Sequence, residues 1–235
     1  MNESNIQKAG RKMKQEFIFV GPPGSGKGTQ TIILSKEMNI PHIDTGALLR
    51  EEIASGSENG KLADGFMSKG QLVPKELVSN IIKNRLMKDD CKNGFILDGY
   101  PRSLEQAEAL DKIFEEIDGS EKVNRIVFYF NIDEELLIER LVNRRSCSKC
   151  GAIYNIKTMK MANHEVCEKC GGKLTRRADD TEEVARKRFD TYFAQTAPLV
   201  DLYKKRGWLA ELDASLSINK IYANLTEVIK QHGNS

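Results

Sequence analysis

Short apolar segments alternate along the chain with longer segments that have helical character. The apolar segments are rich in β-branched and aromatic residues, which favours buried strands. The predicted strands are residues 16–20, 40–43, 94–98, 125–131 and 208–212. The predicted helices are residues 29–38, 48–54, 103–117, 134–145, 181–205 and 218–231, and another that begins at Pro74. Strands that alternate with helices predict an α/β fold in which a parallel sheet carries helices on both faces.

Two segments interrupt the alternation of strands and helices. Residues 44–73 follow a strand, are divided by glycines into short helical pieces, and do not return promptly to the sheet. Residues 143–180 contain nearly all the cysteines and show no helical period. We interpret both as insertions that project from a core formed by residues 14–43, 74–142 and 181–235.

The first predicted strand runs directly into a glycine-rich loop, Gly-Pro-Pro-Gly-Ser-Gly-Lys-Gly-Thr, at residues 21–29. Glycines let such a loop fold so tightly that its backbone N–H groups converge on one anion. The helix that follows adds partial positive charge at its N-terminus. This strand–loop–helix order is the context that a P-loop requires, with the departure that Gly28 separates Lys27 from Thr29. A glycine-rich turn without a ligand is the alternative, and the motif predicts binding of a nucleotide polyphosphate.

Composition narrows the class of protein. The chain has 235 residues, of which 40% are hydrophobic and 30% charged, and its net charge is +2. That charge is too small for a protein that coats nucleic acid, and no apolar run approaches the length of a membrane span. Residues 1–13 show no convincing secretory or transit signal, and we expect a disordered extension there. The expected location is the cytoplasm, with no nucleic-acid or membrane partner.

Four of the five cysteines form two pairs with the spacing of a metal site. Cys147 and Cys150 form one pair, Cys167 and Cys170 the other, and sixteen residues separate the pairs. This spacing matches a tetrathiolate zinc site, and four protein ligands leave no open position, so the expected role is structural. Disulfides, iron in place of zinc, and a zinc ribbon that binds nucleic acid are the alternatives. The fifth, Cys91, is expected to be a small buried apolar residue.

Asp98 ends a hydrophobic strand, where an unpaired carboxylate is costly to bury. Beside a P-loop its expected partner is Mg²⁺, held through water. A helix-capping or salt-bridged aspartate is the alternative.

Arginine is the residue type that indicates most about the ligand. Guanidinium groups match phosphate oxygens bidentately, and several arginines lie at element ends or in the insertions, near the expected cleft. Any one of them alone is more easily explained as a surface residue, but together with a P-loop they predict a phosphate clamp. These arginines are Arg50, Arg102, Arg140, Arg144, Arg177 and Arg188.

No histidine, serine or cysteine shows the pattern of a general base. His42, His164 and His232 are scattered along the chain, and we expect them to be structural or exposed. Phosphoryl transfer onto another phosphate needs no base, because the acceptor oxygen is already ionised. It needs positioning and charge neutralisation, so a site rich in arginine and poor in bases is typical of it.

Taken together, these motifs resemble adenylate kinase. The matching segments are the P-loop and residues 44–50, 70–74, 98–102 with Gln106, and 177–180, in the order and spacing of the family. The cysteine insertion resembles the zinc-bearing lid of its long bacterial-type members. Two positions depart from the family pattern: Ala47 stands where aspartate is frequent, and Ala214 where a glycine usually precedes the contact with the ATP adenine.

The resemblance implies a core with a nucleoside-monophosphate-binding domain at residues 44–73 and a lid at residues 143–180. The residues it implies for AMP are Thr45, Arg50, Gln71, Leu72, Val73, Gly99, Tyr100, Pro101, Arg102, Gln106, Arg177 and Arg188. Those it implies for ATP are Gly24, Ser25, Gly26, Lys27, Gly28, Thr29, Arg144, Ile153, Tyr154 and Leu216. The groups expected to act on the phosphates during transfer are Lys27, Asp98, Arg102, Arg140, Arg144, Arg177 and Arg188.

We therefore expect a monomeric, Mg²⁺-dependent kinase with a structural Zn²⁺ that interconverts ATP plus AMP with two ADP. A GTP:AMP phosphotransferase or a UMP/CMP kinase is the first alternative, although the long metal-bearing lid disfavours the pyrimidine type. A nucleotide-gated module whose zinc ribbon binds nucleic acid is the second. The near-neutral charge and the clustered arginines disfavour it.

Overall fold

The computed structural model describes residues 13–119, 122–159 and 161–233 and has the predicted α/β architecture. The strands of its central sheet are β1 (Lys14–Val20), β2 (His42–Asp44), β3 (Gly94–Asp98), β4 (Val123–Asn131) and β8 (Leu209–Asp213). They lie in the order β2-β3-β1-β4-β8, and every neighbouring pair is parallel. Of the extension expected at residues 1–13, residues 1–12 lie outside the described part of the chain.

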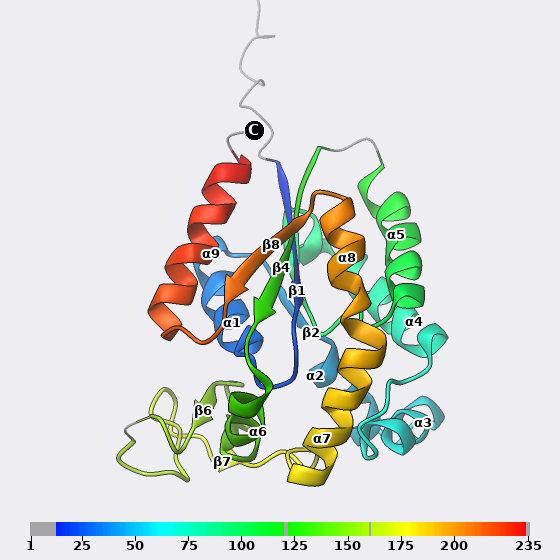
Figure 1. The fold of residues 1–235 in the computed structure, drawn as a ribbon. Coiled ribbons are helices and arrows are strands. Elements are labelled where there is room, and N and C mark those ends of the chain that lie inside the picture. Colours follow the sequence, from blue (N-terminus) through cyan, green and yellow to red (C-terminus); the bar gives the residue numbers. More distant parts are fainter. Residues whose placement is uncertain (1–12, 120–121, 160, 234–235) are drawn as a thin grey trace, which may run out of the picture.

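Helices cover both faces of this sheet (Figure 1). The helices of one face are α1 (Lys27–Met38) and α9 (Ile218–Gly233). The helices of the other face are α4 (Lys75–Leu86), α5 (Leu104–Asp118) and α8 (Pro198–Lys205), and a short 3₁₀ turn, η1 (Asp89–Cys91), precedes β3. Two apolar clusters, one on each face, hold the layers together. In the described residues no helix is long and apolar enough to span a bilayer.

The central strand β1 shows why its sequence is apolar almost throughout. Phe17 and Phe19 pack on the α1 and α9 face, where both rings contact Phe128 of β4. Ile18 and Val20 point to the opposite face and join the cluster beneath α4, α5 and α8. A parallel strand covered on both faces needs apolar residues at successive positions rather than at alternate ones.

One charged residue, Glu16, lies in the predicted strand 16–20, and it forms ion pairs in the structure. Glu16 is completely buried, with Lys14 Nζ 2.8 Å from its Oε1 and the Arg125 guanidinium against its other oxygen. Asp118 completes the cluster by accepting a 2.7 Å hydrogen bond from Lys14. These charges lie near the amino-terminal ends of β1 and β4, away from the edge at which the strands end.

The predicted helix over residues 134–145 is too long. The observed helix α6 (Glu134–Val142) ends at Asn143, whose side-chain amide donates to the carbonyl of Glu139. The chain then enters β5 (Arg144–Cys147), the middle strand of a small antiparallel sheet. Pairing with strands that come later in the chain overrides the local helical pattern.

The predicted helix over residues 181–205 is divided into three. The segments are α7 (Glu182–Thr191), a π-helical turn η2 (Tyr192–Thr196), and α8. Pro198 has no N–H to continue the α-helical ladder, and its ring would press on the carbonyl four residues earlier. The chain instead makes a wider turn, in which the N–H of Ala197 donates to the carbonyl of Tyr192 at 2.9 Å.

The two predicted insertions lie at the carboxyl ends of the strands (Figure 1). Residues 44–73 contain α2 (Thr45–Ala54) and α3 (Glu58–Met67), the short helices that the glycines predicted. Residues 143–180 contain β5, β6 (Ile153–Asn155) and β7 (Leu174–Thr175), a three-stranded antiparallel sheet that was not predicted.

Candidate functional site

A cavity of about 830 Å³ opens at the carboxyl ends of the central strands, between the P-loop and the two insertions. A smaller cavity of about 40 Å³ adjoins it beside α2. Predicted residues that line the large cavity are Gly24, Ser25, Gly26, Lys27, Gly28, Thr29, Arg50, Gln71, Leu72, Asp98, Gly99, Pro101, Arg102, Arg140, Arg144, Ile153, Tyr154, Arg177, Arg188 and Leu216. Thr45, Val73 and Gln106 line the small one. Tyr100 alone among the predicted nucleotide residues borders neither cavity.

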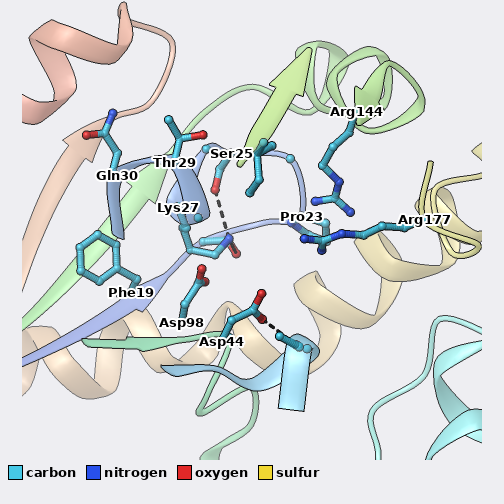
Figure 2. Close-up of a pocket in the computed structure, with 18 of the residues that line it drawn as sticks. Phe19, Pro23, Ser25, Lys27, Thr29, Gln30, Asp44, Asp98, Arg144 and Arg177 are labelled. Carbon is cyan, nitrogen blue, oxygen red and sulfur yellow. Dashed lines mark hydrogen bonds between the residues drawn. The ribbon is translucent and has the colours of Figure 1, made fainter. Parts of the chain in front are cut away.

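The P-loop takes a conformation that its glycines make possible. Gly24 and Gly26 have φ angles of +84° and +93°, in the left-handed region that side chains disfavour. Lys27 opens α1 and folds back over the loop, where its Nζ donates to the carbonyls of Gly21 at 2.7 Å and Pro22 at 2.9 Å. The ammonium group therefore lies at the entrance to the loop, close to Asp98, as Figure 2 shows.

The Lys27 ammonium is held in a strongly positive, buried setting. Burial lowers its pKa to about 8, against the attraction of Asp98, and repulsion from Arg102 and Arg188 acts in the same direction as burial. A buried cation with a depressed pKa is poised to gain from an anionic ligand, which would restore its charged form.

Several arginines converge on the same space, whose lining holds more guanidinium groups than carboxylates. Burial and the charge of Arg144 lower the pKa of Arg177 to about 10, and burial lowers that of Arg188 to about 10 despite Asp179. Within the described residues no carboxylate forms an ion pair with Arg102 or Arg177. Such an excess of buried positive charge is costly unless a polyanion occupies the cavity.

Two adjacent aspartates hold two of these arginines. Asp180 is fully buried and forms an ion pair with Arg144 of β5, and Asp179 accepts from Arg188 of α7 at 2.7 Å. Sequence analysis included both aspartates in a motif but assigned them no contact. The signal in the sequence is that both follow Arg177 within three residues, in the segment that joins the cysteine insertion to α7.

Asp98 ends β3 inside the cavity, and the structure gives it protein partners. His42 Nε2 lies 3.4 Å from its Oδ2, and Thr31 Oγ1 lies 3.0 Å from the same ring nitrogen. Burial alone would raise the pKa of Asp98, but the hydrogen bond from His42 and the charge of Lys27 lower it overall. The carboxylate is therefore ionised at neutral pH. His42, one of three histidines that looked scattered in the sequence, is thus a partner of Asp98.

Around the small cavity, main-chain and side-chain groups fix the loop after β3. The N–H of Arg102 donates to Gln106 Oε1 at 2.8 Å, and the buried Thr45 hydroxyl has no hydrogen-bond partner in the described residues. Tyr100 instead points into the core, where its hydroxyl lies 2.8 Å from Ser79 Oγ. Its side chain therefore has no access to a ligand.

The cysteine insertion reaches over the P-loop. A Cβ at Gly28 would lie 2.9 Å from Cδ1 of Ile153. The glycine that separates Lys27 from Thr29 therefore lets Ile153 approach the P-loop closely. Figure 2 shows Arg144 and Arg177 extending toward the loop from this side. The side chain of Tyr154 packs against the cysteines of the insertion, and its hydroxyl lies 3.3 Å from Cys167 Sγ.

The four cysteines lie together as the spacing predicts. All four sulfurs lie within 4.8 Å of one another, with Cys147 and Cys170 at 3.5 Å and Cys150 and Cys167 at 3.7 Å. A zinc tetrahedron with Zn–S bonds of about 2.3 Å has edges of about 3.8 Å, so the cluster fits such an ion. Sequence analysis missed Gly172, where a Cβ would meet Cys147 Sγ at 2.9 Å.

A phosphate-binding loop, converging arginines and an ionised aspartate on a parallel sheet define a P-loop nucleotide kinase. Comparison with known proteins identifies the family of kinases. The family model for adenylate kinase matches residues 19–208. The chain belongs to the adenylate kinase family and is a nucleoside monophosphate kinase.

The adenylate kinases of three organisms illustrate the relationship. The chain is 44% identical to that of Thermosipho africanus over 215 residues, 92% of this chain and 99% of that protein. Identity to that of Caldicellulosiruptor bescii is 48% over 193 residues, 82% of this chain and 88% of that protein. Identity to that of Archaeoglobus fulgidus is 42% over 215 residues, 92% and 98% of the two chains.

Proposed function

We propose that the chain transfers the γ-phosphoryl group of ATP to AMP, forming two ADP, and that the reaction is reversible. The observation that carries this assignment is the group of partly buried cations between the two ends of the cavity. Lys27 lies at the P-loop end and Arg102 at the end beside α2, with Arg177 and Arg188 also lining the space. Two anionic nucleotides placed phosphate to phosphate would neutralise this charge.

We assign ATP to the P-loop end of the cavity. The backbone N–H groups of residues 24–29 would surround its β-phosphate, and Lys27 would exchange its carbonyl partners for β- and γ-phosphate oxygens. Leu216 and Ile153 supply apolar surface for the nucleoside. Arg140 lies next to this surface, where its Nη1 donates to the carbonyl of Ala214 at 3.1 Å.

We assign AMP to the end beside α2. The predicted residues that line this end are Thr45, Arg50, Gln71, Leu72, Val73, Gly99, Pro101, Arg102 and Gln106. Arg102 and Arg50 would bind the monophosphate, and the unpartnered Thr45 hydroxyl is available to the nucleoside. Tyr100 would act only by supporting the loop that carries these groups.

Chemistry at this site rests on positioning and charge. The AMP phosphate oxygen is already ionised, so this chain needs to hold it in line with the γ-phosphate rather than to remove a proton. Lys27, Arg144, Arg177 and Arg188 would neutralise charge on the transferring group. Asp98 fits a Mg²⁺ ion held through water, because its carboxylate is ionised and faces the cavity. A bound Mg²⁺ would supply further charge neutralisation on the phosphates.

We propose three functional units: a core of residues 14–43, 74–142 and 181–235, a monophosphate-binding domain at 44–73, and a lid at 143–180. Closure of such a lid excludes water and completes the set of charges around the phosphates. The ion pairs of Asp179 and Asp180 with arginines that line the cavity support a lid that delivers those arginines.

We propose that the metal of the four-cysteine cluster is Zn²⁺ and that its role is structural. The described residues around the cluster bury only a small apolar group, so a metal is needed to hold the lid in shape. Cysteines that are paired as metal ligands also support a reducing compartment, and we propose a monomeric cytoplasmic enzyme.

Replacing Cys147 and Cys167 together with serine should abolish zinc binding and lower the melting temperature. Turnover well below that temperature should largely survive, because the cluster lies outside the phosphate site. Metal content, melting temperature and turnover are measured on one preparation, with Cys91→Ser as the control for loss of a buried thiol. A metal-free variant as stable as the parent and yet inactive would show that the metal is catalytic.

The affinity for ATP should fall as the pH rises above about 8. In the free protein Lys27 loses its proton in this range, whereas bound phosphates favour its protonated form. ATP binding is therefore coupled to protonation of Lys27, and it weakens as the pH rises. ATP itself is fully ionised there, because a terminal phosphate titrates near pH 6–7. Titrations with ATP from pH 7 to pH 9, below the range in which Arg177 and Arg188 titrate, measure the slope. A Lys27→Arg variant, whose charge does not titrate there, should show no slope; an equal slope would contradict the assignment.

A coupled assay that offers ATP or GTP against AMP, CMP, UMP and GMP tests the proposed function. We expect AMP to be the preferred acceptor and ATP to serve as the donor. A donor preference for GTP would make the chain a GTP:AMP phosphotransferase, and efficient use of UMP or CMP would overturn the AMP assignment. Binding to nucleic acid in a shift assay would favour the alternative of a nucleotide-gated module.

A further inference from the structure

The π-helical turn η2 brings two of its side chains inward at the nucleotide cavity. Tyr192 and Thr196 are both buried and both line the cavity, although they belong to the connection between α7 and α8. A π turn holds one residue more than an α turn, which rotates the side chains that follow by about 100°. The placement of Thr196 therefore depends on this irregular turn, which Pro198 at the start of α8 favours.

Among the described residues, the side chain of Thr196 makes one hydrogen bond, and that bond reaches the loop after β3. Its Oγ1 donates to the main-chain carbonyl of Arg102 at 2.7 Å, and the threonine is only 6% exposed. The other main-chain group of Arg102, its N–H, donates to Gln106 Oε1 at 2.8 Å. The carbonyl and the N–H of Arg102 are thus both hydrogen-bonded to side chains, the carbonyl to one from η2 and the N–H to one from α5.

The side chain of Arg102 begins from this doubly held segment. Its Nε donates to the carbonyl of Gly99 at 2.8 Å, and its Nη2 would lie 2.7 Å from a Cβ at that glycine. Partial burial of the guanidinium lowers its pKa, and it has no ion-paired carboxylate among the described residues. Its direction into the cavity is consequently set by the backbone and not by an ion pair.

We propose that Thr196 is a positioning residue for the acceptor nucleotide. Its hydroxyl, presented by the π turn, holds the Arg102 carbonyl and so aims the guanidinium at the phosphate of the monophosphate substrate. The proposal rests on the proposed function, in which Arg102 binds the AMP phosphate. Loss of the hydroxyl should therefore weaken AMP binding selectively and leave the P-loop, on the other side of the cavity, undisturbed.

The test compares Thr196→Val, which removes the hydroxyl at constant volume, with Thr196→Ser, which keeps it. Calorimetric titrations with AMP and with ATP give the two affinities for each variant, and a melting curve checks the fold. We expect Thr196→Val to weaken AMP binding about five- to tenfold, the usual effect of one buried hydrogen bond. ATP affinity should stay within about twofold, and Thr196→Ser should restore AMP binding. Thr196→Ala provides the same comparison should the valine variant not fold.

A double variant separates positioning from general stabilisation. If Thr196 acts through Arg102, adding Thr196→Val to Arg102→Ala should not weaken AMP binding further. An equal loss in both backgrounds, or equal losses for AMP and ATP, would overturn the inference. So would unchanged AMP affinity in Thr196→Val while Arg102→Ala alone still weakens it. An Arg102→Ala variant with normal AMP affinity would instead overturn the proposed AMP site, and this inference with it.

Discussion

Replacing Lys27 with alanine should lower kcat about 10²- to 10³-fold without unfolding the protein. The P-loop carbonyls of Gly21 and Pro22 hold the ammonium at the entrance to the loop, at 2.7 and 2.9 Å. In the proposed mechanism its interaction with the γ-phosphate would strengthen as charge develops during transfer, so the loss should fall on kcat more than on substrate binding. Steady-state kinetics at saturating nucleotides, together with a melting curve, measures both effects.

Lys36→Ala is the matched control, because it removes an exposed lysine from the same helix, α1, outside the cavity. We expect that variant to keep the kcat and the melting temperature of the parent. A Lys27→Ala enzyme with near-parental turnover would contradict the assignment of the P-loop to the donor phosphates.

Removing the guanidinium of Arg102 or of Arg50 should weaken AMP binding far more than ATP binding. Each change removes a charge-assisted contact worth roughly 1.5–3 kcal/mol, equivalent to a factor of about 10 to 150 in affinity. Arg102 should have the larger effect, because it has no carboxylate partner among the described residues, whereas Arg50 lies 3.6 Å from Asp44. Equilibrium titrations with each nucleotide, on the alanine variants, give the comparison.

Arg186→Ala provides the control for loss of an arginine, since Arg186 lies on α7 and is 61% exposed beside Glu182. It should leave both affinities unchanged. Equal losses for AMP and ATP in the Arg102 and Arg50 variants, or a loss for ATP alone, would show that residues 44–73 do not form the monophosphate site.

The features that could be predicted from the sequence are those with a local physical signature. The strands of the central sheet are buried on both faces, so they are apolar throughout and easily found. The P-loop is recognisable because its glycines and Lys27 act within one strand–loop–helix unit. The cysteine pairs are equally local, since tight turns set the spacing of two ligands each.

The features that sequence analysis missed depend on contacts between distant segments. The early end of α6 follows from the pairing of Ser146 with Thr175, almost thirty residues later. His42 comes close to Asp98 only because β2 lies beside β3 in the sheet. Tyr100 stands within a motif that suggests ligand contact, but its side chain is buried in the core and lies beside Ser79.

One local signal was present and was not used. Pro198 follows a strong helical pattern, and a proline there interrupts the ladder even where the apolar spacing continues. The resulting π turn is also what places Thr196 beside Arg102. The lesson is physical: an apolar pattern predicts which face a helix buries, but backbone hydrogen bonds decide how the helix turns.

Phosphorus NMR of the purified enzyme with equimolar ATP, AMP and Mg²⁺ tests the central claim most directly, because it observes every phosphate at once. We predict loss of the ATP and AMP signals in a one-to-one ratio and the appearance of two ADP for each pair, with no inorganic phosphate. Starting from ADP as the only nucleotide, with the same Mg²⁺ and the same total nucleotide concentration, the same final mixture should form. Release of inorganic phosphate, or consumption of ATP without conversion of AMP, would contradict the account.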